Sequence, residues 1–384
     1  MTDMPPVGLY IHFPFCKSRC IYCAFYSQTQ YSDFQHYTDC IINEAKAMAS
    51  SSDVFTEHTG ITTVYLGGGT PSLVPVKLLA YLFDKLSSDF DLTNTEEITI
   101  EVNPDDVNDE WVRQIKDCTP IDRISIGVQS FNDDELKMIN RRHNAYKACK
   151  AIEIISQHFD NFSIDLIYGL PLQTPESWQA SINKAMAYRP KHISAYALSI
   201  ENGTPLAKMV SEGKTTVPDE DFAISCYHNL NETLREHGYL HYEISNYCLP
   251  DYHSRHNSNY WKDFPYIGIG AGAHSYDCKS RYWNVKDINE YIKRTDSGLD
   301  AAEHETITQD MKYNEYIMLG LRTSQGIDYQ YINDIFGKEK LNHTIESANK
   351  VSRQYIMPDI HNALILNEEG ILFADGIASD FFII

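Results

Sequence analysis

Short apolar and β-branched runs alternate with helix-like segments through the first half of this chain. Six such runs read as strands, at residues 7–13, 61–66, 97–102, 123–128, 162–167 and 191–199. Helix-like segments lie between them, at residues 33–49, 76–86, 109–116, 133–139, 146–157 and 176–187. Strands that alternate with helices predict an α/β fold, in which helical crossovers join the strands of a parallel sheet.

The residues that can carry chemistry recur directly after these runs. Cysteines follow the first run, three glycines the second, Asn103 the third, Gln129 the fourth and a Gly-Leu-Pro triplet the fifth. A doubly wound sheet and an open barrel both fit the alternation. Barrel enzymes place their chemistry at the C-terminal ends of several strands. This placement therefore favours an open, partial (β/α)6 barrel.

Three cysteines stand close together after the first strand. Cys16, Cys20 and Cys23 have the spacing C-x3-C-x2-C within YIHFPFCKSRCIYCAF. This spacing suits three corners of a four-iron cluster, for which thiolates are the usual ligands. With no obvious fourth cysteine, one iron is left open to an exchangeable ligand. A zinc site completed by a histidine and unrelated reduced thiols are the alternatives, although the repeated C-x2-C units of common zinc sites are absent.

The cysteine spacing, with Tyr22 before the last cysteine, resembles the radical S-adenosylmethionine (SAM) superfamily. The resemblance implies a partial barrel of six βα units and a 4Fe–4S cluster whose open iron is chelated by SAM. The stretch GGGTP at residues 67–71 is similar to the glycine motif that contacts the SAM amino group in this superfamily. Taken alone, GGGTP is also a common strand-to-helix turn with proline near the helix start.

Further polar residues resemble the coproporphyrinogen-oxidase-like branch of the superfamily. The resemblance implies that a set of residues at or near the strand ends contacts SAM. These residues are Tyr10, Gly68, Gly69, Thr70, Glu101, Gln129, Arg141 and Asp165. Each is a weak signal on its own, because surface acids and amides are common.

Two departures separate the chain from the oxidase itself. The oxidase has a further cysteine two positions after the third one, where this chain has Phe25, and it has a longer segment before the cluster loop. Both differences favour the sister family of heme chaperones, HemW, whose signature is C-x3-C-x-Y-C-x-F. This signature is satisfied by Cys16, Cys20, Tyr22, Cys23 and Phe25.

The stretch HNSNYW, at residues 256–261, resembles the H-N-x-x-Y-W motif of the heme chaperones. The resemblance implies a role in holding heme. A neutral imidazole such as that of His256 can be an axial iron ligand, and Tyr260 and Trp261 can flank a flat macrocycle. The alternative is that the first two make ordinary hydrogen bonds and the tryptophan fills a core. His274 is a weaker candidate ligand.

Three functions follow from these patterns. The preferred one is a heme chaperone that binds heme and a SAM-ligated 4Fe–4S cluster and passes heme to an acceptor, such as a respiratory protein. The alternative is an oxygen-independent coproporphyrinogen III oxidase, a radical SAM enzyme that decarboxylates propionate side chains. Whether the chain is an enzyme stays open. A regulatory or structural zinc protein is the third.

The composition limits which classes of partner and which cellular compartment we expect. The net charge of −21 argues against a nucleic-acid partner, because a negative surface repels phosphates. Nine cysteines do not form the even framework of a secreted domain. No signal peptide and no apolar run of about 18 residues is visible. We expect a cytoplasmic protein without a membrane span, and leave peripheral membrane contact open.

The alternation stops near residue 205, which predicts three parts. Residues 1–205 are the barrel with the cluster loop, residues 206–300 a barrel extension with the heme region, and residues 301–384 a C-terminal domain. The ending ALILNEEGILFADG reads as two strands around a Glu-Gly turn. With a preceding helix pair it predicts a small α+β, winged-helix-like module that acts as a lid or docking element.

Overall fold

The computed structural model describes residues 6–31, 33–51, 60–298, 302–358 and 362–383. Within these ranges, one twelve-stranded sheet with the order β12-β11-β10-β9-β1-β2-β3-β4-β5-β6-β8-β7 forms the frame of the molecule. Its six middle strands are parallel and follow chain order: β1 (Val7–Phe13), β2 (Ile61–Gly68), β3 (Glu97–Val102), β4 (Arg123–Gln129), β5 (Phe162–Tyr168) and β6 (His192–Ala197). The predicted open (β/α)6 arrangement is confirmed.

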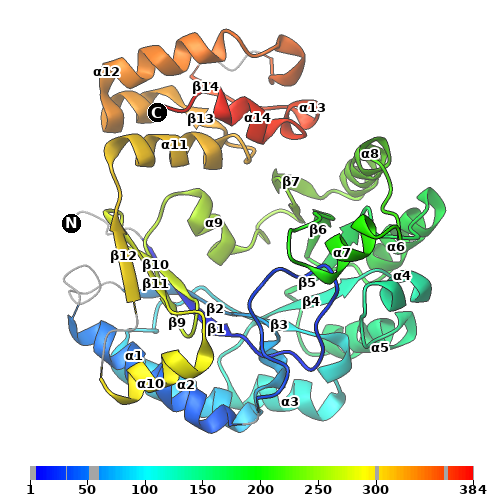
Figure 1. Cartoon of the computed structure of the whole chain (residues 1–384), viewed down its shortest axis with the longest axis vertical. Coiled ribbons are helices and arrows are strands. Elements are labelled where there is room, and N and C mark those ends of the chain that lie inside the picture. Colours follow the sequence, from blue (N-terminus) through cyan, green and yellow to red (C-terminus); the bar gives the residue numbers. More distant parts are fainter. Residues whose placement is uncertain (1–5, 32, 52–59, 299–301, 359–361, 384) are drawn as a thin grey trace.

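Helices join these strands and cover the convex side of the curved sheet (Figure 1). They are α1 (Phe34–Ser51), α2 (Val76–Asp89), α3 (Asp109–Cys118), α4 (Asp133–Met138), α5 (Ala145–Ser156) and α6 (Pro175–Ala187). Side-chain caps fix where several begin: Asn108 accepts from Trp111 N in α3, and Asn144 accepts from Lys147 N in α5. The helices bury their apolar faces against a core that runs along the whole sheet.

Both edges of the six-stranded unit are extended by later parts of the chain. On the β1 edge lie β9 (Tyr266–Ile269), β10 (His274–Tyr276), β11 (Ser280–Asn284) and β12 (Ala302–Thr306), of which β9 runs parallel to β1. On the β6 edge lies a hairpin of β7 (Leu240–Glu243) and β8 (Asn246–Cys248). The barrel therefore stays open, since β1 and β6 each pair with an added strand.

Further helices connect these edge strands. They are α7 (Pro205–Ser211), α8 (Glu220–Glu236), α9 (Arg255–Trp261) and α10 (Ile288–Asp296). The short helix α9 lies against the concave side of the sheet, while α10 packs beside α1 (Figure 1).

The C-terminal part is mainly helical and stands over the concave side of the sheet (Figure 1). It contains α11 (Gln309–Gly320), β13 (Ile327–Asp328), α12 (Tyr329–Ala348), β14 (Ala363–Leu364), α13 (Glu368–Ile371) and α14 (Ala374–Ser379). The prediction of a second strand after the Glu-Gly pair is wrong, because this segment forms the helices α13 and α14. Asn367 caps α13 by accepting from Gly370 N at 2.9 Å. The two-stranded ribbon of this part joins β13 to β14 instead.

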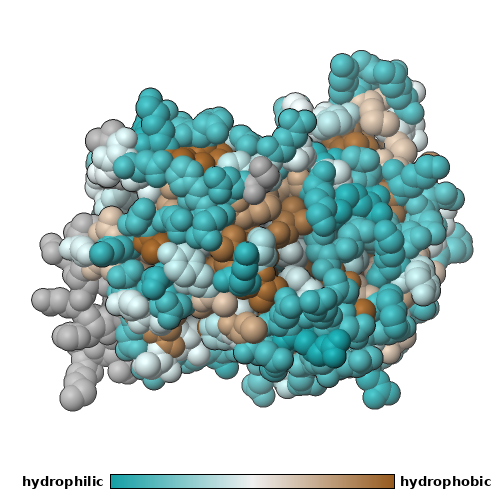
Figure 2. Space-filling view, turned by 90° about the horizontal axis from the view of Figure 1, so that it is seen from below, coloured by the Kyte–Doolittle hydropathy of each residue, from teal (hydrophilic) through white to brown (hydrophobic). Residues whose placement is uncertain are grey.

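The three-part division stays a prediction, and its boundary at residues 300 and 301 lies outside the described residues. Of the helices in the described ranges, none has the length and apolar character needed to cross a bilayer. Figure 2 shows the face opposite the C-terminal helices, where hydrophilic side chains dominate and apolar ones gather toward the middle. A mainly hydrophilic surface agrees with the acidic composition.

Candidate cluster and cofactor site

The segment after β1 folds back on itself and presents the three predicted cysteines. Cys16 N donates to the carbonyl of Gln28 at 3.0 Å, and Gln28 N donates to the carbonyl of Pro14 at 2.8 Å. All three thiols are free and partly exposed. Burial raises the pKa of Cys23, and the charges of Cys20 and Cys16 raise it further. The three predicted cluster ligands are therefore free thiols on one folded-back loop.

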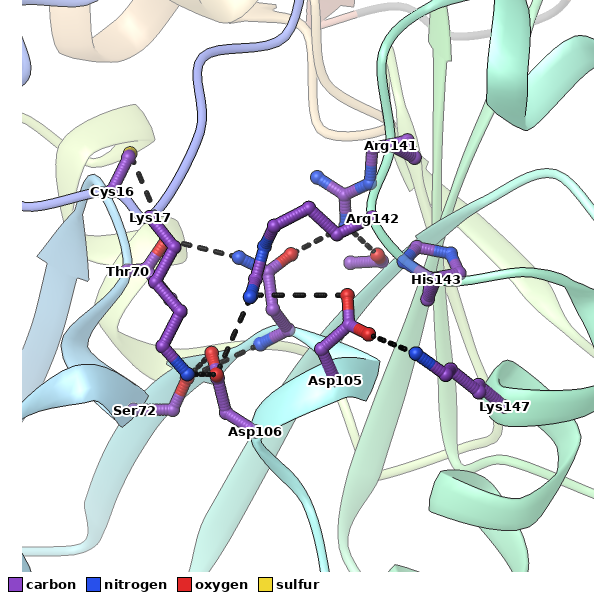
Figure 3. Close-up of polar contacts among 12 residues, drawn as sticks. Cys16, Lys17, Thr70, Ser72, Asp105, Asp106, Arg141, Arg142, His143 and Lys147 are labelled. Carbon is purple, nitrogen blue, oxygen red and sulfur yellow. Dashed lines mark hydrogen bonds and ion pairs between the residues drawn. The ribbon is translucent and has the colours of Figure 1, made fainter. Parts of the chain in front are cut away.

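Two donors from the barrel reach these sulfurs. The Thr70 hydroxyl donates to Sγ of Cys16 at 3.7 Å (Figure 3). Arg141 Nη1 donates to Sγ of Cys20 at 3.6 Å. Arg141 Nη2 also donates to Asn103 Oδ1 at 2.5 Å and to the carbonyl of Gly127. The guanidinium is thus fixed between β3, β4 and the cluster loop. A cation and a hydroxyl beside thiolates stabilise their charged form.

A buried carboxylate, which sequence reasoning missed, fastens the cluster loop to the barrel. Asp106 follows β3 in a 3-10 turn, and its side chain is only 3 % exposed. Its Oδ1 accepts from Lys17 Nζ at 2.7 Å and from Arg142 Nη2 at 3.4 Å (Figure 3). Its Oδ2 accepts from the Ser72 hydroxyl at 3.1 Å. The only sequence signal was the stretch NPDD directly after a strand.

The three glycines after β2 pass close to the cluster loop. A Cβ atom on Gly69 would lie 2.6 Å from the carbonyl oxygen of Phe15, the residue before the first cluster cysteine. Gly68 has a φ of 113° and donates its N–H to Oε2 of Glu101 at 3.1 Å. A side chain at either position would push the loop away or strain the backbone. The glycines are therefore required by close packing as well as by the predicted ligand contact.

Two carboxyl groups predicted to contact SAM lie on the concave side of the sheet. Oε1 of Glu101 accepts from the Tyr65 hydroxyl at 2.9 Å. Burial raises the pKa of Glu101 to about 7; the charge of Asp165 also raises it, while the bonds from Tyr65 and Gly68 act in the opposite direction. Asp165 accepts from the Ser125 hydroxyl at 3.1 Å, and burial raises its pKa too. Both carboxyls therefore favour ligand groups that donate hydrogen bonds, such as ribose hydroxyls.

Tyr10 and Gln129 complete the predicted set. The Tyr10 hydroxyl is hydrogen-bonded to Nδ1 of His12 at 2.9 Å, and its ring stacks on Tyr65 at 6.2 Å between centroids. Gln129 has a φ of 69°, and its Oε1 is buried without a hydrogen-bond donor among the described residues. Such an orphaned acceptor is costly unless a ligand supplies the donor. The residues present thus fit a bound polar cofactor.

The second predicted motif lies deeper in the concave side. His256, in α9, is 1 % exposed, and its Nδ1 is 2.9 Å from the Thr63 hydroxyl. Its Nε2 is 3.0 Å from the Tyr260 hydroxyl, and its ring stacks on Tyr65 at 5.2 Å. Burial lowers the pKa of His256 to about 3, so the imidazole is neutral at physiological pH. Trp261 is half-buried at the end of the helix.

The structure thus joins most of the predicted SAM residues into one region and places the histidine motif behind it. Tyr65 links the two, since it contacts Glu101 on one side and His256 on the other. His274, the weaker heme candidate, lies exposed on β10 with its ring stacked on Trp283 at 6.2 Å.

Comparison with known proteins agrees with this geometry. Residues 10–185 match the family profile described as "Radical SAM superfamily". Membership of this superfamily implies a 4Fe–4S cluster and SAM. The three free thiols fit the cluster, and the orphaned amide oxygen of Gln129 fits a polar cofactor such as SAM. In overall structure the chain resembles the Escherichia coli coproporphyrinogen III oxidase HemN, with a TM-score of 0.83 at 20% sequence identity. That match covers 98% of this chain and 90% of the oxidase. At this identity the likeness shows a shared fold.

Relatives found by sequence identify the family more narrowly than the superfamily profile and the shared fold do. The chain is 34% identical to "Heme chaperone HemW" of Lactococcus lactis, over 84% of this chain and 83% of the relative. It is 33% identical to the protein of the same name from Mycobacterium tuberculosis, over 98% of this chain and 95% of the relative. With the cluster loop, the glycine turn and the histidine motif all in place, the chain belongs to the HemW family of the radical SAM superfamily.

Proposed function

We propose that this protein binds heme and transfers it to an acceptor protein, and that it carries a SAM-ligated 4Fe–4S cluster. The observation that carries the proposal is identity of 33–34% to relatives named heme chaperone HemW across most of the chain. Phe25 supports it, because this residue occupies the position of the oxidase's additional cysteine and is 72 % exposed beside the cluster loop.

Within this proposal, Cys16, Cys20 and Cys23 hold three irons, and the amino and carboxylate groups of SAM complete the fourth. The Gly68 backbone and Thr70 would hold the methionine end of SAM, while Glu101 and Asp165 would accept hydrogen bonds from its hydroxyl groups. Gln129 offers its orphaned amide oxygen. The SAM-bound cluster supplies a radical source in this superfamily, and the chain's own residues bind, orient and shield it.

The heme region remains a proposal for His256, Tyr260 and Trp261. Both imidazole nitrogens of His256 are engaged, so iron ligation at Nε2 requires that the Tyr260 hydroxyl move away first. Displacement of the phenol would leave Thr63 to hold the imidazole by Nδ1, which is the usual arrangement of a ligating histidine. Heme binding would therefore be coupled to a rearrangement of α9.

The acceptor and the compartment also belong to the proposal. We propose a cytoplasmic protein, because free cysteines beside an iron–sulfur cluster suit a reducing environment. The acceptor would be a heme protein, such as a respiratory one, reached directly or at a membrane surface.

The decisive experiment is an anaerobic heme titration of cluster-loaded protein, with coproporphyrinogen decarboxylation assayed on the same preparation. We expect stoichiometric heme binding and no vinyl product. A Trp261→Ala variant tests the heme region, and its iron and sulfide content should match that of the unaltered protein. Loss of heme binding in this variant supports the assignment. Heme binding no tighter than to an unrelated acidic protein would refute the chaperone function.

A second candidate function is favoured by the close structural likeness to HemN. Turnover of coproporphyrinogen without tight heme binding would make the chain a decarboxylase. The exposed Phe25 at the position of the additional cysteine argues against this outcome.

A further inference from the structure

A second group of metal-ligating side chains lies between helices α1 and α10, outside the cluster loop. His36, Cys40 and Asp296 bring one ligand atom each to within 4.8 Å of one another. His36 Nε2 is 3.0 Å from one Asp296 oxygen and 3.1 Å from the other. Cys40 Sγ is 3.7 Å from Oδ1 of Asp296. Imidazole, thiolate and carboxylate thus converge from two helices that are far apart in the sequence.

Helix periodicity explains how these groups meet. His36, Cys40 and Glu44 are four residues apart and share one face of α1. Glu44 accepts from the Tyr291 hydroxyl of α10 and from Asn284 Nδ2, both at 2.6 Å, which fixes α10 along this face. Asp296, the last residue of α10, then falls opposite His36 and Cys40. The two helices lie side by side in Figure 1.

The observed spacings fit a small tetrahedral cation. Zinc binds nitrogen and oxygen at about 2.0–2.2 Å and sulfur at about 2.3 Å, so its tetrahedral ligands stand about 3.3–3.6 Å apart. The separations from Asp296 to His36, 3.0 and 3.1 Å, and from Asp296 to Cys40, 3.7 Å, differ from this range by a few tenths of an ångström, and the ligand atoms of His36 and Cys40 lie within 4.8 Å of each other. Insertion of a cation therefore requires only a small outward movement of the two half-exposed side chains, His36 and Asp296.

The surroundings of the group connect it to the cluster loop. Tyr31 stacks on Phe15 at 4.6 Å and lies edge-on to Tyr37, the neighbour of His36, at 6.2 Å. Its buried hydroxyl has no hydrogen-bond partner among the described residues. Packed rings thus join the start of α1 to the segment that carries Cys16.

We propose that His36, Cys40 and Asp296 form a binding site for a divalent cation of the zinc class, with solvent in the fourth position. One thiolate with imidazole and carboxylate suits Zn²⁺ better than Ca²⁺ or Mg²⁺, which prefer oxygen ligands throughout. The cation ties α10 to α1. This site is separate from the three cluster cysteines and does not depend on heme.

The test adds one equivalent of zinc to cluster-loaded protein under anaerobic conditions, removes free metal, and measures retained zinc, iron and sulfide. We expect stoichiometric zinc in the unaltered protein and its loss in His36→Gln, whose exposed side chain leaves the core intact. Cys40→Ala should lose zinc as well, while Cys118→Ala, an exposed cysteine on α3, should retain it. Iron and sulfide should be unchanged in all four proteins.

Zinc-edge X-ray absorption on the same sample identifies the ligands. One sulfur near 2.3 Å with nitrogen or oxygen near 2.0 Å would support the site. A shell of three sulfurs would mean that zinc occupies the cluster cysteines and would overturn the proposal. Equal zinc in the unaltered protein and in both ligand variants would overturn it too, as would failure of the unaltered protein to retain zinc.

Discussion

His256 in α9 and Thr63 in β2 form a buried hydrogen bond of 2.9 Å between Nδ1 and Oγ1, although 193 residues separate them. The backbone N–H of His256 also donates to Oε1 of Glu97, at the start of β3. The histidine of the H-N-x-x-Y-W motif therefore holds α9 against two barrel strands. Any part it plays in heme binding is added to this structural role.

Replacement of His256 by alanine should destabilise the protein. The change removes two side-chain hydrogen bonds, at about 1–3 kcal/mol for each buried group that loses its partner. The Tyr260 hydroxyl loses the imidazole, and the Thr63 hydroxyl keeps only the amide of Asn259, which donates to it at 3.4 Å. We expect the free energy of unfolding in urea to fall by about 2–5 kcal/mol. His274→Ala, at an exposed position, should change it by less than about 0.5 kcal/mol. Similar values for both variants would contradict the structural role of His256.

Gly69→Ala should disturb the cluster loop. The new methyl group would meet the Phe15 carbonyl at 2.6 Å, so the segment that leads to Cys16 must shift. We expect lower iron and sulfide content, and SAM affinity reduced about tenfold or more, which is about 1.4 kcal/mol. Gly376→Ala is the matched control, because nothing lies within 4 Å of its added Cβ. Full cluster loading and unchanged SAM affinity in Gly69→Ala would count against the close packing.

Cys20→Ala should abolish the cluster, because the two remaining thiolates cannot hold four irons. Iron and sulfide, measured after anaerobic reconstitution, should fall to background. Cys118→Ala should reconstitute fully. A Cys20→Ala protein that kept its iron and sulfide would show that the cluster ligands lie elsewhere.

Asp106→Asn should loosen the cluster loop without removing a ligand. The carboxylate holds Lys17 and Arg142, and its neutral replacement removes the ion pair to Lys17 and leaves Arg142 with only its longer ion pair to Asp105, at 3.8 Å. We expect cluster loss to an iron chelator to become several-fold faster, followed by absorbance. Asp89→Asn, at the end of α2, serves as control. Equal rates of loss in the two variants would mean that Asp106 does not fasten the loop.

The stability of the cofactor-free protein should fall between about pH 4.5 and pH 7. Burial raises the pKa values of Glu101 and Glu243 from 4.5 to about 7, so the folded state binds these protons more tightly than the unfolded chain. Their contribution is full below the unfolded pKa and is lost as pH rises through the folded one, at up to about 3 kcal/mol for each group.

Urea unfolding across this range checks the prediction. Glu101→Gln should remove part of the slope, and the double variant with Glu243→Gln should remove most of the remainder. Asp165 faces Glu101 from β5, so its own raised pKa sharpens the effect. A slope that is unchanged in both variants would assign the pH dependence to other groups.

The barrel core could be predicted from the sequence because its signals are local. β-Branched runs, asparagine and threonine caps and glycine turns lie within a few residues of the elements they determine. The edge strands could not, since the four residues of β9 pair with β1 only through a long-range contact. The ending GILFADG was misread because its apolar residues fit a strand as well as the short helices that a cap at Asn367 begins.

The site was predictable where a motif existed. The cysteines, glycines and the strand-end residues matched a known pattern, and the structure joins most of them by contacts. Asp106 was missed because an acidic pair after a proline reads as an exposed turn. Its burial depends on Lys17 and Arg142, which are brought to it from distant segments.

The position of β1 between β2 and β9 has a consequence for biosynthesis. When the ribosome has made the first 205 residues, the strand that carries the cluster loop is still an open edge, because β9 has not yet been translated. Open edges invite pairing with other nascent chains. The edge closes only once residues 266–269 have emerged and paired with β1, so iron delivery to the loop is best timed after that step.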